Sequence, residues 1–166
     1  MGESGLEIVE RQLGRRVSNF RRVVFSCPFG YPVVIESHPI RDGKPFPTLY
    51  WLTCPHLRKE VSKLEEAGWI ERFEKMVEKD RNFKERMFRA HEEIIKRRGD
   101  LIEDDEIRKV MMNLGTGGIS DWRHVKCLHL HLADYLAGVE NPIGEIVWNS
   151  IKSKFCRGNR CSSLTP

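Results

Sequence analysis

Two runs of β-branched residues, RRVVFS and YPVVIES, flank the tetrapeptide Cys27–Gly30, which reads CPFG. Proline favours the second position of a tight turn and glycine the fourth, so this tetrapeptide can reverse the chain. The two runs then lie side by side as an antiparallel hairpin. TLYWLT, residues 48–53, is a third short run of β-branched and aromatic residues. The sequence therefore predicts a small antiparallel sheet made of a hairpin and a third strand.

Most of the remaining chain is predicted to be helical, because apolar residues recur at helical spacing among charged ones. In RNFKERMFRAHEEIIKRRGD, for example, Phe83, Met87, Ala90 and Ile94 make one apolar stripe. Helices packed on a small antiparallel sheet form an α+β fold. We expect about five or six of them. Helical patterns occupy residues 5–15, 55–67, 69–100, 102–115, 121–137 and 141–155.

The length and composition are those of one globular domain. With 166 residues, of which 40% are hydrophobic, the chain can bury one core and is short for two. We expect a single domain over residues 1–155 and a flexible, cysteine-containing tail over 156–166. Charged residues interrupt the apolar runs and the first residues include acids, so neither a membrane span nor an export signal is predicted. A cytoplasmic protein is the expectation.

Five cysteines in a cytoplasmic chain are more often thiols, metal ligands or reactive groups than disulfides. Cys54 precedes Pro55, and if this proline is the first residue of a helix, Cys54 is the N-cap. The positive end of the helix dipole then lowers the pKa of its thiol, and His56 and Arg58 act in the same direction. The alternative is that Cys54 is a small buried residue between strand and helix.

Two further cysteines have different settings. Cys27 lies on the predicted turn, where backbone N–H groups can point at a sulfur, as in half of a metal-binding knuckle. Cys127 lies in the predicted helix 121–137, where the helical period places it on one face with His124 and His131. These side chains are therefore expected to point at one place.

Cys27, Cys54 and Cys127 together suit a three-thiolate metal site. Three cysteines can hold a [4Fe–4S] cluster whose fourth iron stays open, and this iron–sulfur cluster is the first expectation for a cofactor. Three cysteines with a histidine would suit zinc instead. A disulfide between Cys156 and Cys161, with four residues between them, also stays open. The competing interpretation is that the cysteines never meet.

A glycine-rich loop precedes the helix predicted around Cys127. Gly117, Gly118 and Ser120 would present free N–H groups to an anion at the start of that helix. The loop matches neither the P-loop nor the dinucleotide fingerprint, and glycine loops before helices are common.

Residues 11–22, RQLGRRVSNFRR, form a basic arm with five arginines and no acid. The net charge of +4 is too small to indicate nucleic-acid binding by itself. The arm is either a contact surface for RNA or an acidic protein, or a solvated basic face, and the second is favoured.

Several motifs occur together in this chain: CPFG, PFPTLYWLTCPHL, RAHEE, DWRHVKCLH and NPIG. With this set the chain resembles the bacterial family called domain of unknown function 501, from about Arg22 to Gly144. The resemblance implies no known activity. It does imply that certain residues belong together, and that Cys156 or Cys161 is a possible fourth metal ligand. The residues on which the motifs fall are Cys27, Cys54, His91, Cys127 and His129.

Three hypotheses of function follow. The first is a metalloprotein, either an enzyme or a metal-dependent regulator, in which His91 or His129 is a ligand or acid–base group. Asp121 and Arg123 would then orient a small anionic or nucleotide-like substrate. The second is a thiol-based redox protein or sensor with Cys54 as the reactive thiol. The third is a binding module for nucleic acid or protein that uses the basic arm.

Overall fold

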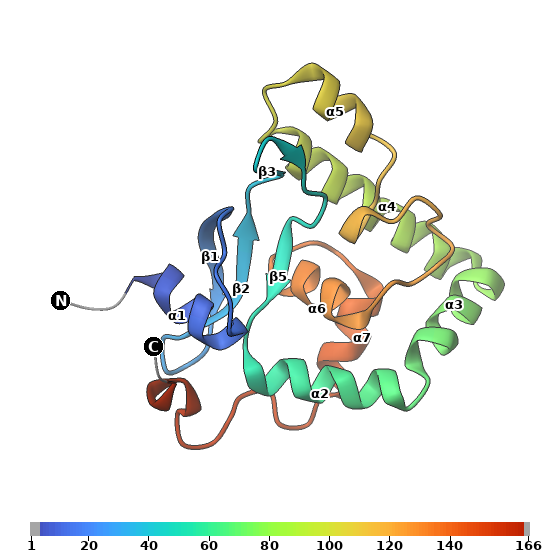
Figure 1. Ribbon diagram of the computed structural model, residues 1–166. Helices are drawn as coiled ribbons and strands as arrows, with labels where there is room; N and C mark the ends of the chain where they lie inside the picture. The colour runs from blue at the N-terminus through green and yellow to red at the C-terminus, as the bar shows by residue number, and fades with distance from the viewer. Residues whose placement is uncertain (1–3, 165–166) are drawn as a thin grey trace.

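The computed structural model describes residues 4–164 and contains the predicted three-stranded sheet (Figure 1). Its strands are β1 (Phe20–Ser26), β2 (Pro32–Ser37) and β5 (Tyr50–Leu52), antiparallel in the order β1-β2-β5. The predicted turn closes the hairpin, since the Cys27 amide donates to Tyr31 O at 2.9 Å and the Gly30 amide donates to Cys27 O at 2.8 Å. The hairpin and the third strand are confirmed.

The sequence between β2 and β5, whose proline and glycine content is typical of a loop, contains a small ribbon. This ribbon pairs β3 (Ile40–Arg41) with β4 (Lys44–Pro45). Between the two strands, Asp42 and Gly43 both have positive φ, as a two-residue hairpin turn requires. The ribbon lies apart from the main sheet and forms a second sheet of its own.

Helices make up the rest of the fold, and the α+β class is confirmed. A capping box formed by Ser4 and Glu7 starts α1. Pro55 and Pro142 occupy the first turns of α2 and α7, as predicted from their positions. The helices of the described residues are α1 (Gly5–Leu13), α2 (Pro55–Glu66), α3 (Trp69–Lys79), α4 (Arg81–Gly99), α5 (Asp105–Met111), α6 (Leu128–Leu136) and α7 (Pro142–Ser150), with short 3-10 turns η1 (Thr116–Gly118) and η2 (Arg160–Ser163).

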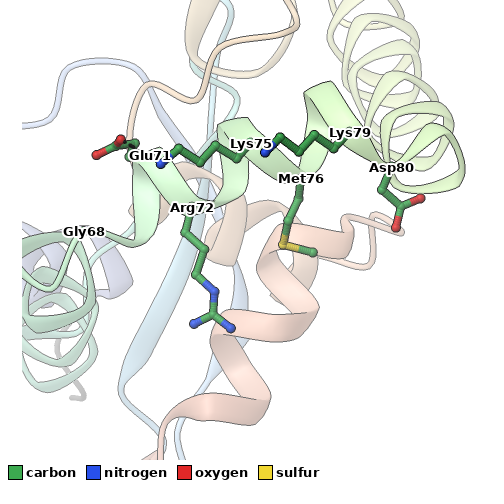
Figure 2. A pocket seen from close by; sticks show the side chains of 7 residues that line it. All are labelled: Gly68, Glu71, Arg72, Lys75, Met76, Lys79 and Asp80. Atoms are coloured by element: carbon green, nitrogen blue, oxygen red, sulfur yellow. Dashed lines mark ion pairs between the residues drawn. The ribbon is translucent and has the colours of Figure 1, made fainter.

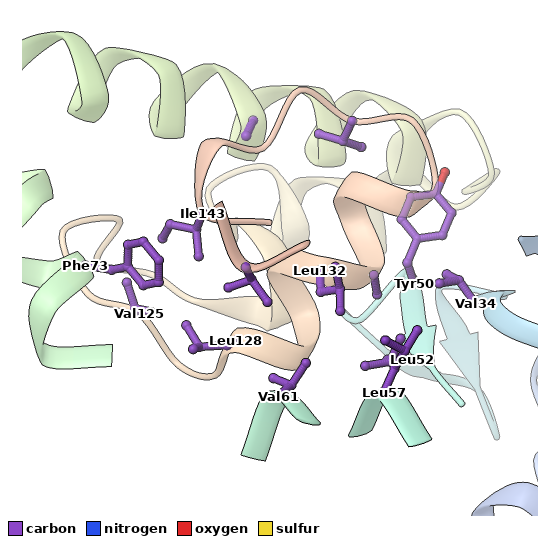
Figure 3. Packing of buried hydrophobic residues seen from close by; sticks show 14 of the residues in the cluster. Val34, Tyr50, Leu52, Leu57, Val61, Phe73, Val125, Leu128, Leu132 and Ile143 are labelled. Carbon is purple, nitrogen blue, oxygen red and sulfur yellow. The ribbon is translucent and has the colours of Figure 1, made fainter. Parts of the chain in front are cut away.

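The main core forms where α6 passes between the sheet and the other helices (Figure 3). Leu128 and Leu132 of α6 are fully buried there, with Leu52 of β5, Val61 of α2 and Ile143 of α7 in the same cluster. A smaller cluster lies on the other side of the sheet, under α1. Helix α6 is thus the central element of the core, buried over its middle and partly exposed at both ends.

The predicted helix 121–137 is wrong in its first half, because α6 begins only at Leu128 and Cys127 is its N-cap. The reason is tertiary. Side-chain carboxylates accept the amides that a helix would have used: Glu74 accepts from the Val125 amide at 3.0 Å, and Glu65 accepts from the Leu128 amide at 2.8 Å. The segment before Leu128 therefore runs as turns and extended chain.

The C-terminal segment packs against the body of the protein. The ring of Phe155 meets Trp148 edge-on at 6.1 Å, and Ser153 O lies 2.6 Å from His56 Nε2 at the start of α2. Arg11 of α1 donates to Leu164 O at 3.3 Å. The predicted flexibility of 156–166 stays a prediction, and residues 1–3 and 165–166 lie outside the described part.

None of the helices between residues 4 and 164 combines the length and the apolar composition that crossing a bilayer requires.

Candidate functional site

Four of the five cysteines belong to segments that lie at one corner of the molecule, which we call the cysteine corner: Cys27, Cys54, Cys156 and Cys161. Cys27 lies on the β1–β2 turn, Cys54 precedes α2, and the other two lie on the C-terminal segment that returns toward this end of the sheet (Figure 1). Burial is the main cause of the raised pKa of Cys54 and of Cys161, and negative charge on the other corner cysteines raises both further.

A hydrogen-bonded bridge joins the C-terminal segment to the hairpin at this corner. Gln12 Nε2 donates to Pro32 O at 2.8 Å and to Cys161 Sγ at 3.4 Å. Pro32 begins β2 directly after the turn that carries Cys27, and the hydroxyl of Thr53, the neighbour of Cys54, donates to the same Pro32 O at 3.4 Å. Pro32 O and Gln12 thus link the segments that carry Cys27, Cys54 and Cys161.

Cys54 is the N-cap of α2 with Pro55 as the first helical residue, as predicted. The predicted low pKa is wrong. Burial raises the pKa of the Cys54 thiol and outweighs the lowering by hydrogen bonds from the Leu57 and His56 amides. The side chain is only 7% exposed. The thiol is therefore protonated at neutral pH unless a cation neutralises it.

The corner thiols are spaced more widely than a bare zinc site requires. Four thiolates around zinc, each about 2.3 Å from the metal, lie roughly 3.8 Å from one another in a tetrahedron. Within residues 4–164, the set of three ligand atoms that all lie within 4.8 Å of one another is Glu65, Cys127 and His129, and none of the corner cysteines belongs to it. All five cysteines are free thiols, so no disulfide joins Cys156 to Cys161.

Cys127 lies away from the corner, beside the far half of α2. The second cluster, Glu65–Cys127–His129, also touches Ser62, whose Oγ is 3.3 Å from His129 Nε2. Ser62 and Glu65 follow Cys54 by eight and eleven residues, which is roughly 12–16 Å along a helix axis. The predicted set of three cysteines is therefore divided between two places.

The histidines expected beside Cys127 point elsewhere, because the helical face on which that prediction rested does not exist. His124 is exposed and lies 3.4 Å from Glu74 Oε1. His131 is fully buried, with its Nδ1 2.9 Å from Asn141 Nδ2. The prediction that His124, Cys127 and His131 share one place is wrong, whereas His129, expected on the apolar side, contacts Glu65.

His91 joins His131 in a buried polar group between α4 and α6. The two rings lie 6.2 Å apart, His91 stacks on Trp122 at 5.2 Å, and its Nδ1 accepts from the Thr116 amide at 3.1 Å. Burial lowers the pKa of His91 to about 4 and that of His131 to about 3. Both rings are neutral at pH 7, and neither lies with the cysteines or with His129.

These two histidines predict loss of stability in acid. Their unfolded-state pKa is about 6.5, above the folded values, so the unfolded chain takes up protons first and stability falls as pH drops from 6.5 toward 4. His91→Gln should reduce this slope by up to about 1.4 kcal/mol per pH unit. Urea unfolding at several pH values measures it, with the exposed His124→Gln as control. An unchanged slope in His91→Gln would contradict the assignment.

The glycine loop has a packing role. Gly117 and Gly118 have positive φ, and a Cβ on them would lie 2.3 Å from Leu130 and 2.6 Å from Pro47. The Gly118 amide donates to Gly115 O, and the helix that should begin after Ser120 starts at Leu128. These glycines thus have a structural reason of their own, and the anion site at Gly117, Gly118 and Ser120 stays a prediction.

Asp121 and Arg123 pair with each other on the surface. Two hydrogen bonds, at 3.0 and 2.8 Å, join the guanidinium to the carboxylate, and they hold the pKa of Asp121 well below its usual value. In the basic arm, Arg21 and Arg22 both bond to Glu36. These charges are partly used within the fold, and their predicted roles in binding stay predictions.

A groove of about 450 Å³ follows α3 (Figure 2). Arg72 and Met76 project from one side of α3, and Glu71 and Lys75 form an exposed ion pair at 3.1 Å. The guanidinium of Arg72 lies over the Trp69 ring at 5.1 Å. The lining side chains come from one helix and its ends, so this groove is a solvated helix face.

Sequence reasoning missed Glu65 and Gln12, which complete the two cysteine clusters. Neither belongs to a motif, and each forms a hydrogen bond with a residue more than sixty positions away. Glu65 accepts from the Leu128 amide, and Gln12 donates to Cys161 Sγ.

Comparison with curated proteins and with solved structures found no match to this chain. A family model does match, over residues 23–149. This span includes the turn with Cys27, the start of α2 with Cys54, and the Glu65–Cys127–His129 cluster. The chain therefore belongs to the family described as "Protein of unknown function (DUF501)".

Proposed function

We propose that this chain is a metalloprotein whose cysteine corner holds an iron–sulfur cluster, with Cys27, Cys54, Cys156 and Cys161 as ligands. The proposal is carried by the grouping, at one corner, of the three chain segments that bear these cysteines, which Gln12 and Pro32 O link together. Cys27 and Cys54 were the sequence-based candidates, and Cys156 and Cys161 take the place of Cys127.

A cubane cluster needs less closely spaced thiols than a single zinc ion does. In a cubane cluster each cysteine binds a different iron, so the four sulfurs stand further apart than around one metal ion. Among the described residues no three of the corner thiols lie within 4.8 Å of one another, so the proposal is for a cluster and not for a single zinc ion.

The local backbone also suits thiolate ligands. The thiol of Cys54 lies at the start of α2, where the amides of Leu57 and His56 act to lower its pKa against the larger effect of burial, and Cys27 lies at a turn. Hydrogen bonds to cluster sulfurs and shielding from water set the reduction potential of such sites. Near in sequence to Cys27 and Cys156, the rings of Phe25 and Phe155 each meet Trp148 edge-on, at 6.3 and 6.1 Å.

Four protein thiolates leave no iron open for a substrate. The corner is therefore better suited to electron transfer, redox sensing or a structural role than to substrate activation at an iron. The alternative of a reactive thiol at Cys54 has less support, because a buried thiol with a raised pKa is a poor nucleophile at neutral pH.

The test is a set of single cysteine-to-serine variants purified without air. We expect the visible absorption of the cluster to be lost in Cys27→Ser, Cys54→Ser, Cys156→Ser and Cys161→Ser. Cys127→Ser is the matched control and should keep the full absorption, because Cys127 lies at the other cluster. Absorption lost in Cys127→Ser but kept in Cys156→Ser and Cys161→Ser would overturn the proposed ligand set. Stoichiometric zinc in place of iron would overturn the cluster.

A further inference from the structure

The Glu65–Cys127–His129 cluster has the geometry of a second metal site. One carboxylate oxygen, one thiol sulfur and one imidazole nitrogen all lie within 4.8 Å of one another. The side chains are only partly exposed, at 21% for Glu65 and 26% for His129. They come from two helices that pack together. Glu65 is in the last turn of α2, and the other two residues lie at the start of α6.

Hydrogen bonding fixes which nitrogen of His129 is available. His129 Nε2 lies 3.1 Å from the carbonyl oxygen of Arg58, which can only accept, so Nε2 carries a proton and donates it. Nδ1 then faces Glu65 Oε1 at 3.3 Å. Nδ1 therefore turns its lone pair toward the carboxylate, the arrangement in which one metal ion between the two groups would be bound by both. Metal-binding histidines commonly donate their other N–H to a backbone carbonyl in this way.

Cys127 supplies the third donor atom of the cluster, because its Sγ lies within 4.8 Å of the carboxylate oxygen and of the imidazole nitrogen. A divalent cation bound by all three groups would balance both the carboxylate and a thiolate.

The donor set identifies the metal. A thiolate, an imidazole and a carboxylate are the ligands that zinc takes in proteins, and three protein ligands leave the fourth tetrahedral position open. We propose that Glu65, Cys127 and His129 bind a zinc ion with one coordination position open to an exogenous anion.

The neighbouring pocket indicates where that anion would bind. A pocket of about 330 Å³ has Cys127 and His129 on its wall together with Arg15 and Arg58. Arg15 lies over the Trp51 ring at 5.5 Å, which holds its guanidinium at the pocket. Two arginines and a metal ion attract a small anion, such as a phosphate or a carboxylate. This site is independent of the cysteine corner and shares no residue with it.

The test is zinc affinity of the full-length protein, measured by competition with a chelator of known affinity. We expect the affinity for one bound zinc ion to fall by more than about 100-fold in each of three variants, Cys127→Ser, Glu65→Gln and His129→Gln. Loss of a residue that only supports a ligand already lowers metal affinity by up to about 100-fold, and loss of a ligand should cost more. Cys27→Ser should leave this zinc affinity unchanged, which separates this proposal from the iron–sulfur proposal. Glu65→Gln is the most informative variant, because a glutamine oxygen still accepts the Leu128 amide and preserves the start of α6. Unchanged zinc affinity in Glu65→Gln and Cys127→Ser would overturn the site.

The open position is tested with cobalt in place of zinc. A thiolate-to-cobalt absorption band that disappears in Cys127→Ser reports the site, and inorganic phosphate should shift the cobalt spectrum. Arg58→Met should weaken this response at least tenfold while leaving cobalt binding intact. A spectrum that phosphate does not change at any concentration would overturn the open, anion-binding position.

Discussion

Replacing Arg98 with methionine is expected to lower the free energy of unfolding by about 3 kcal/mol, the upper end of the cost of leaving buried acceptors unsatisfied. Arg98 is completely buried near the end of α4. Its Nη1 donates to Pro47 O at 2.9 Å and to Gly115 O at 3.2 Å, and its Nη2 donates to Met111 O at 2.8 Å and to Leu114 O. Methionine fills much of the same volume but leaves four carbonyl groups without this donor.

The measurement is urea unfolding followed by circular dichroism. Arg81→Met on the same helix is the control, because the Arg81 side chain is 92% exposed and pairs with Glu85 on the surface. A change of at most about 0.5 kcal/mol is expected there. If Arg98→Met cost no more than Arg81→Met, the guanidinium would not be what holds these loops to α4.

Gly144→Ala is expected to cost about 3 kcal/mol, the upper end for an overpacked core. A Cβ at Gly144 would lie 2.2 Å from His131 O and 2.5 Å from Tyr135 Cβ, so the backbones of α6 and α7 are in direct contact. Backbone atoms cannot move aside as the end of a long side chain can, and the two helices would have to separate. The same separation would disturb the Asn141–His131 contact.

Gly99→Ala provides the matched control for this prediction. Gly99 is the last residue of α4, and a Cβ there would meet no atom within 4 Å. Alanine should be neutral or stabilise by up to about 1 kcal/mol, since it restricts the unfolded chain and favours the helix. Thermal or urea unfolding should therefore give clearly different results for the two glycines. Equal stabilities would contradict the close helix packing.

The parts of the fold that follow from local chemistry could be predicted from the sequence. The CPFG turn closes the hairpin by its own backbone hydrogen bonds. Pro55 and Asn141 mark helix starts because they act within one turn of the chain. Such signals depend on neighbours in sequence, so the sheet and most helices were within reach.

The candidate sites depend on partners that are distant in sequence, and two predictions about them are wrong for this reason. Cys127 was placed inside a helix because nothing near it shows that Glu65 and Glu74 take the amides at this point. The pKa of Cys54 was given the wrong direction because the helix dipole is a local feature, whereas burial comes from the folded chain as a whole.

The composition of the cysteine corner could be predicted only in part. Cys27 and Cys54 stand out by their Cys-Pro settings, whereas Cys156 and Cys161 lie in a segment with no pattern of its own. Their place at the corner depends on how the last residues return to α1 through Gln12.

The iron–sulfur cluster at the cysteine corner is tested by the iron and acid-labile sulfide content per chain of wild-type protein purified without air. We expect about four irons and four sulfides per chain, as one [4Fe–4S] cluster requires. These should accompany a separate zinc equivalent at Glu65–Cys127–His129. Protein that folds fully and carries neither iron nor sulfide, even after reconstitution with both, would contradict the proposed cluster.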